Sequence, residues 1–206
     1  PLRLVGSEMC IRDRLTAMSV DRVEQIYSSK TSSCQIMEAD TEQGRILAVE
    51  KNKRFFPLNS CYDAKKASKE WAEQFDREDI NDNSTIIVYG LSDGRSILEL
   101  CRKRSNCRVI IYEPCQEIFW KAMEYEEVAQ IAENENVCLI VKGICEEYFF
   151  HALQSVLDYS NFQLVVQAVL PNYLQIFREE YQEMIDVYRS VVEPVSYTHL
   201  TLPTNS

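Results

Sequence analysis

Two short segments of the chain carry residues whose types and spacing suit ligand binding. Residues 90–94 form a glycine turn between a strand-like run and a helical run, with Gly90 and Gly94 at its ends and Asp93 inside it. Glycine lets the backbone approach a ligand closely, and the first N–H groups of a helix can bind one. Glu113 follows at about the spacing at which an acidic residue binds ribose hydroxyls in dinucleotide-binding folds. We therefore predict a nucleoside site formed by these residues.

Asp93 narrows the class of ligand. The turn has the pattern GxxxG rather than the GxGxxG of dinucleotide-binding folds, and Asp93 places a negative charge where a pyrophosphate would lie. We therefore expect a nucleoside-type ligand without close phosphates, such as an adenosyl group. A structural alternative stays open, in which Gly90 and Gly94 only permit a tight turn and Glu113 caps the next helix.

Few other residues suggest catalysis or metal binding. His151 lies in a helical stretch beside two phenylalanines, with no evident partner acid or nucleophile, so we expect it to be packed or at the surface. Lys142 is a lone cation in a loop. The eight cysteines are scattered and none forms a CxxC pair, which argues against zinc or a disulfide framework. We expect no metal and assign no catalytic residue within the chain.

The acidic composition argues against partners that carry many negative charges. The net charge is -10, and the hydrophobic fraction of 46% is typical of a soluble globular protein. Nucleic acids and anionic membranes are bound through basic patches, so we expect neither as a partner. No apolar run is long enough to span a bilayer, and no signal peptide is visible. These features predict a cytoplasmic protein.

The elements that must position the candidate site follow an alternating pattern from residue 85 onward. Apolar β-branched runs alternate with helical periodicity, which predicts an α/β, Rossmann-like and mostly parallel sheet with flanking helices. The carboxyl ends of its strands would carry the loops at residues 90–94, 113–114, 142–143 and 170–173 at one edge. The expected strands lie at 85–89, 108–112, 137–141 and 162–166, and the helices between them at 95–103, 116–133 (with a break near Tyr125) and 146–158.

A small β-meander precedes this domain, and a long helix follows it. Strand-like runs at 34–39, 45–50 and 54–58 are joined by turns, and Pro57 places the last of them at an edge. A helix at 63–75 and a polar linker follow, so we divide the chain into residues 15–80 and 81–194. The final helix has an apolar stripe formed by Leu174, Phe177, Tyr181, Met184, Tyr188 and Val191.

The two ends of the chain are related at the level of DNA. Residues 7–13 can be encoded by a string whose reverse complement encodes residues 195–201. The core of that string resembles the transposon tag used to prepare sequencing libraries, and a natural gene has no reason to carry such an inverted pair. We therefore expect residues 1–14 and 195–206 to be artefactual and a C-terminal continuation of the natural protein to be missing.

Several short motifs resemble one family, the motility accessory factor glycosyltransferases of bacteria. They are Tyr62-Asp63 at the start of a helix, Ile-Val-Tyr-Gly-Leu-Ser-Asp-Gly at 87–94, Val-Ile-Ile-Tyr-Glu-Pro at 109–114 and Pro-Asn-Tyr at 171–173 before the long helix. The resemblance covers most of residues 34–192.

The resemblance implies an N-terminal, non-catalytic domain of a truncated cytoplasmic enzyme. Members of the family are thought to transfer a nonulosonic acid from a CMP-sugar to Ser or Thr of flagellin. The missing C-terminal transferase domain, which resembles a pterin pyrophosphokinase, and flagellin would then be the partners. The fragment alone would be inactive. The long final helix could also dock such a partner.

The glycine turn also resembles the first motif of methyltransferases that use S-adenosylmethionine. In those enzymes Glu113 would hold the ribose hydroxyls, whereas an acidic or small residue precedes the turn where this chain has Tyr89. The alternative function is therefore an S-adenosylmethionine-dependent, methyltransferase-like or nucleoside-binding domain.

Overall fold

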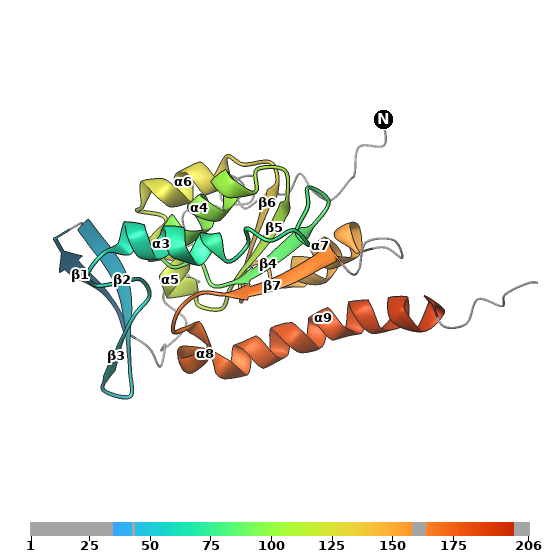
Figure 1. Cartoon of the computed structure of the whole chain (residues 1–206). Helices are drawn as coiled ribbons and strands as arrows, with labels where there is room; N and C mark the ends of the chain where they lie inside the picture. Colours follow the sequence, from blue (N-terminus) through green and yellow to red (C-terminus); the bar gives the residue numbers. More distant parts are fainter. Residues whose placement is uncertain (1–34, 43, 158–163, 200–206) are drawn as a thin grey trace, which may run out of the picture.

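The apolar β-branched runs in the second half of the chain form a parallel sheet in the computed structural model, which describes residues 35–42, 44–157 and 164–199 (Figure 1). Neighbouring strands are all parallel, and β4 is buried along its whole length, as expected for a central strand covered by helices. The α/β, Rossmann-like fold predicted from the sequence is confirmed. In spatial order the strands are β6 (Val137–Val141), β5 (Arg108–Glu113), β4 (Thr85–Tyr89) and β7 (Val165–Val169).

The strand order changes direction beside β4. The chain adds β5 and then β6 on one side of β4, and later places β7 on the other side. Ligands of open α/β sheets commonly bind at the carboxyl ends of the strands at such a switch point. Tyr89 at the end of β4 is in register with Tyr112 of β5 and with Val169 of β7. The glycine turn, Glu113 and the loop at residues 170–173 therefore begin side by side at one edge of the sheet.

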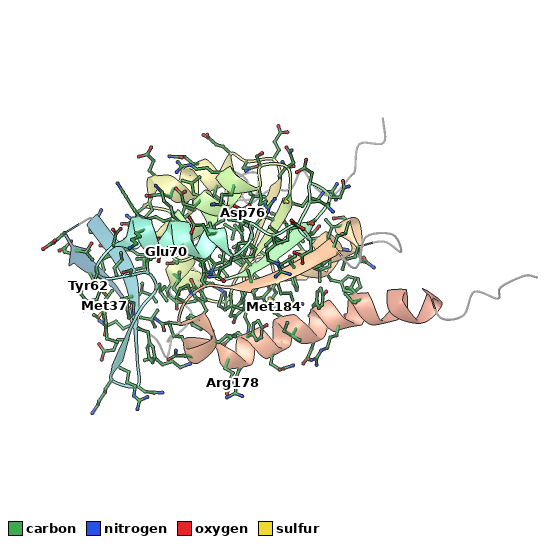
Figure 2. All side chains as sticks on the ribbon, in the orientation of Figure 1. Met37, Tyr62, Glu70, Asp76, Arg178 and Met184 are labelled. Atoms are coloured by element: carbon green, nitrogen blue, oxygen red, sulfur yellow. The ribbon has the colours of Figure 1, made fainter. Side chains whose placement is uncertain are left out.

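Helices cover both faces of the sheet. On one face α3 packs against α4, and α4 packs against α6; on the other, α7 packs against α9 (Figure 1). Met184 of α9 points toward the sheet and is buried, whereas Arg178 at the start of that helix points away (Figure 2). The expected break near Tyr125 is present between α5 and α6. The bounds are α3 (Ala64–Glu73), α4 (Arg95–Lys103), α5 (Gln116–Ala122), α6 (Glu126–Ala132), α7 (Glu147–Val156), α8 (Tyr173–Ile176) and α9 (Arg178–His199).

The expected β-meander is also present, as an antiparallel sheet of β1 (Gln35–Thr41), β2 (Gly44–Lys51) and β3 (Arg54–Pro57). Asn52 and Lys53 both have positive φ in the two-residue turn between β2 and β3, which suits a tight hairpin. Pro57 lies in an edge strand, as predicted. We refer to these three strands and Leu58 after them as the meander.

Most element boundaries lie within two residues of the sequence prediction, but two elements differ more. The fourth strand is Val165–Val169 and so ends three residues beyond the predicted end at residue 166, because pairing with β4 sets its register. The final helix is broken at Phe177, whose carbonyl accepts a hydrogen bond of 2.8 Å from the Tyr89 hydroxyl. Leu174 is consequently 43% exposed and does not belong to the buried stripe.

Some expectations fall outside the described residues. The proposed artificial N-terminal end at residues 1–14, the first residue of the first expected strand (Cys34) and residues 158–163 all lie outside them. Within the described part of the chain, no helix combines the length and apolar character needed to cross a membrane.

Candidate functional site

Glu113 stands at the centre of the candidate site. It is the last residue of β5, and its side chain is completely buried. One carboxylate oxygen accepts hydrogen bonds from the Leu91 N–H at 2.7 Å and from the Tyr173 hydroxyl at 2.8 Å. The other oxygen accepts the Cys115 N–H at 2.9 Å. The parallel register of β4 and β5 places Glu113 beside the glycine turn, as the sequence predicts.

The surroundings of Glu113 favour its neutral form. Burial raises the pKa of this carboxyl to about 8, although hydrogen bonds from Tyr173, Cys115 and Leu91 oppose that shift. These donors are a hydroxyl and two backbone N–H groups, so none of them brings a full positive charge to offset the desolvation. The described contacts of the Glu113 carboxyl are therefore those of a group bound by neutral donors, one of them a hydroxyl.

Tyr173, which the sequence analysis placed only in a loop, lies on the glycine turn. Its ring is fully buried, and its hydroxyl also accepts hydrogen bonds from the Ser92 N–H at 2.8 Å and from the Leu91 N–H at 3.3 Å. A Cβ atom on Gly90 would come within 2.7 Å of the Tyr173 ring, and Gly90 has φ +106°. The close approach to Gly90 that we expected of a ligand is thus made by Tyr173.

Gly94 and Asp93 make contacts with groups other than Glu113 and Tyr173. A Cβ on Gly94 would lie 2.8 Å from Val128 Cγ2, so this glycine lets α4 approach α6. The Asp93 carboxylate is 1% exposed and accepts hydrogen bonds from the Asn59 amide at 3.2 Å and from the Arg95 guanidinium at 2.7 Å. Burial raises the pKa of Asp93, and the charge of Arg95 opposes this. Asp93 therefore belongs to a second network, which joins the loop after the meander to α4.

Arg95 should hold this second network together. Its guanidinium contacts Asp93 and also Glu127, at 3.2 Å, and it is only 14% exposed. We expect Arg95→Met to lower the free energy of unfolding by about 2 kcal/mol, because it leaves the buried Asp93 without its cation. The loss stays below that of a fully buried pair because Asp93 can take up a proton.

Urea denaturation followed by tryptophan fluorescence would measure this loss. The matched control is Arg102→Met on the same helix, since the side chain of Arg102 is 58% exposed, pairs with Glu99 at 2.7 Å and makes one long hydrogen bond of 3.5 Å to Gln130. We expect the control to change stability by less than about 0.5 kcal/mol. Equal losses in the two variants would contradict the structural role given to Arg95.

The side chains of Lys142 and His151, the two other residues considered from the sequence, contact groups other than the Glu113 carboxyl. The Lys142 side chain forms an ion pair with Glu183 of α9, while its backbone N–H donates to the Glu113 carbonyl at 3.0 Å. His151 is exposed on α7 between the rings of Tyr148 and Phe150. Among the described residues, no group of three or more His, Cys, Asp or Glu side chains is placed to hold a metal ion.

Comparisons with known proteins yield distant structural likenesses only. No protein-family model matches the chain, and no curated protein sequence matches it. Among solved structures, spermidine synthase from Thermotoga maritima aligns with a TM-score of 0.36 and 11% identity over 59% of this chain and 44% of that protein. MnmC2 from Aquifex aeolicus aligns with a TM-score of 0.31 and 14% identity over 72% of this chain and 56% of that protein. The chain thus spans about half the length of each.

Proposed function

We propose that this chain is a nucleoside-binding Rossmann-like domain of the methyltransferase-like type, in which Glu113 accepts a ribose hydroxyl. The observation that carries the proposal is the bond of 2.8 Å from the Tyr173 hydroxyl to the buried Glu113 carboxylate, at the switch point of the sheet. A hydroxyl already occupies the position that the ribose hydroxyl would take. The domain is therefore in a closed form, and a nucleoside would replace Tyr173 on the same carboxylate oxygen.

Replacing the Tyr173 hydroxyl by a ribose hydroxyl would keep the number of hydrogen bonds to Glu113 the same. The ribose hydroxyl would restore the hydrogen bond that Tyr173 gives up, so the buried carboxyl keeps a donor. The base of the nucleoside would occupy apolar space that the Tyr173 ring leaves. The apparent affinity of the ligand is lowered by the small fraction of molecules in which Tyr173 has moved away.

Titration calorimetry with S-adenosylmethionine and with CMP tests the proposal. We expect one of the two to bind, and Glu113→Gln to weaken that binding at least about tenfold, because an acceptor oxygen of the carboxyl is replaced by an NH2 group that cannot accept the ribose hydroxyl. Tyr173→Phe should tighten binding by about tenfold, since the closed form loses the hydroxyl bonds that maintain it.

Two matched variants control for effects of these substitutions that do not depend on the site. Glu135→Gln makes the same change at an exposed residue, and Tyr188→Phe removes a hydroxyl from a half-buried tyrosine of α9. Both should bind as the parent does. The proposal fails if neither ligand gives heat with the parent or with Tyr173→Phe, or if Glu113→Gln binds as tightly as the parent.

A second candidate is the non-catalytic N-terminal domain of a cytoplasmic motility accessory factor glycosyltransferase. The observation that favours it is the complete burial of Tyr173, whose Pro-Asn-Tyr motif is among those that resemble the family. Here Tyr173 would close the site permanently, and the partners would be a transferase domain and flagellin. Flanking DNA that continues into a transferase domain would support this candidate, and a stop codon directly after Pro194 would exclude it.

A further inference from the structure

The segment that carries Tyr173 is bound by the meander. This segment, residues 170–177, runs from the end of β7 through α8 to the start of α9. The Asn172 side-chain amide donates to the Pro57 carbonyl at 2.6 Å. The Lys51 ammonium donates to the Ile176 carbonyl and lies 6.0 Å from the centre of the Phe177 ring. Strands far away in sequence therefore hold both ends of α8.

These two contacts lie where the segment changes direction. Asn172 has φ +64° directly before α8, and Phe177 leaves the helical conformation directly after it. A helix of four residues has little stability of its own, so its position depends on tertiary contacts. The Lys51 ammonium also lies at the carboxyl end of α8, where a positive charge stabilises the last carbonyls of a helix.

The meander also contacts the turn on which Tyr173 rests. The Ser92 hydroxyl donates to the Leu58 carbonyl at 3.0 Å, and the Ser92 N–H donates to the Tyr173 hydroxyl at 2.8 Å. The meander thus binds both the segment that supplies the tyrosine and the turn that receives it. Shifting the meander would loosen both sides of the contact together.

We infer that the meander controls whether Tyr173 occupies Glu113, through the contacts of Lys51 with Ile176 and of Asn172 with Pro57. With these contacts in place residues 170–177 stay on the glycine turn, and without them the segment can move and expose the Glu113 carboxylate. The exposed carboxylate would receive the nucleoside hydroxyl; this last step rests on the proposed function, whereas the control of Tyr173 does not.

Amide hydrogen exchange on the full chain tests the inference without any ligand. The Ser92 N–H donates to the Tyr173 hydroxyl, so it exchanges when Tyr173 moves away. The Leu91 N–H donates to this hydroxyl and also, at 2.7 Å, to Glu113, so its exchange requires that the Glu113 bond open as well. We expect Lys51→Met to raise the exchange rate of Ser92 about tenfold, as follows from losing a charged hydrogen bond, and that of Leu91 by a smaller factor. Asn172→Gly should raise the Ser92 rate about threefold, because it removes the neutral bond to Pro57 and a long bond of 3.4 Å from the Gln175 amide, while glycine keeps the positive φ. Amides inside β4 and β5 should keep their rates.

The control is Lys53→Met, the same substitution in the same hairpin at an exposed residue. It should leave the rates at Leu91 and Ser92 unchanged. Unchanged rates in both Lys51→Met and Asn172→Gly would overturn the inference. A uniform rise across β4 and β5 would also overturn it, since the meander would then support the whole sheet rather than Tyr173.

Titration of Lys51→Met with S-adenosylmethionine and CMP separates the two proposals. Faster exchange at Leu91 and Ser92 together with tighter binding of one of these ligands supports both proposals. Faster exchange at these amides without binding of either ligand supports control by the meander and removes the proposed function.

Discussion

Gly90→Ala is expected to lower the free energy of unfolding by about 4 kcal/mol. The added methyl group would lie 2.7 Å from the Tyr173 ring, closer than carbon atoms can approach, and the backbone has φ +106°. A side chain at positive φ costs about 1–2 kcal/mol, and overpacking of a buried contact adds about 1–3 kcal/mol. Urea denaturation followed by fluorescence of the two tryptophans would measure the loss.

Gly44→Ala separates the two contributions. Gly44 has a nearly equal φ of +113°, but its Cβ would meet nothing closer than the Arg95 guanidinium at 3.9 Å. This control should therefore lose only the backbone part, about 1–2 kcal/mol. Adding Tyr173→Ala to Gly90→Ala should reduce the cost of the glycine substitution to the same value, as a double-mutant cycle would show. Equal costs for Gly90→Ala with and without Tyr173 would mean that the ring does not set the requirement for glycine.

The contact of Tyr173 with Glu113 is a feature of the site that the sequence did not predict. Alternation of apolar runs and helical periodicity correctly predicted β4, the glycine turn and the place of Glu113, because these depend on neighbours in the chain. The loop at residues 170–173 was expected at the same edge. Its bond to Glu113 was not, because it joins residues 60 positions apart and depends on β7 lying beside β4.

The errors have the same physical origin. The register of β7 is set by its pairing with β4, which the local pattern of apolar residues does not contain. The break at Phe177 is decided by the Tyr89 hydroxyl, which comes from the centre of the sheet. Asn59 could not be placed beside Asp93 from the sequence, since a polar loop residue carries no periodic signal. Local pattern thus predicts elements, whereas tertiary contacts decide the polar pairs of the site.

The same Glu113 that defines the candidate site should make the domain less stable as pH rises. Burial raises the pKa of Glu113 to about 8 from an ordinary value of 4.5. Between these values the folded chain keeps a proton that the unfolded chain has released, so unfolding becomes easier with increasing pH. We expect the contribution of Glu113 to fall by about 3 kcal/mol between about pH 5 and about pH 8, as measured by urea denaturation at a series of pH values.

Glu113→Gln isolates this contribution, because the amide has nearly the same shape and does not titrate. At about pH 5 the variant should be less stable than the parent by about 1–3 kcal/mol, since its NH2 group faces N–H donors. The difference should shrink as the pH rises and have vanished or reversed by about pH 8, because the parent must then bury a charge. Asp93, whose pKa is also raised, titrates in both proteins and so cancels in the comparison. Glu135→Gln, at an exposed position, should keep the full slope of the parent. If Glu113→Gln keeps the dependence of stability on pH, the buried carboxyl is ionised throughout this range. Tyr173 would then donate its hydrogen bond to a charged carboxylate, and so would a ribose hydroxyl that replaced it.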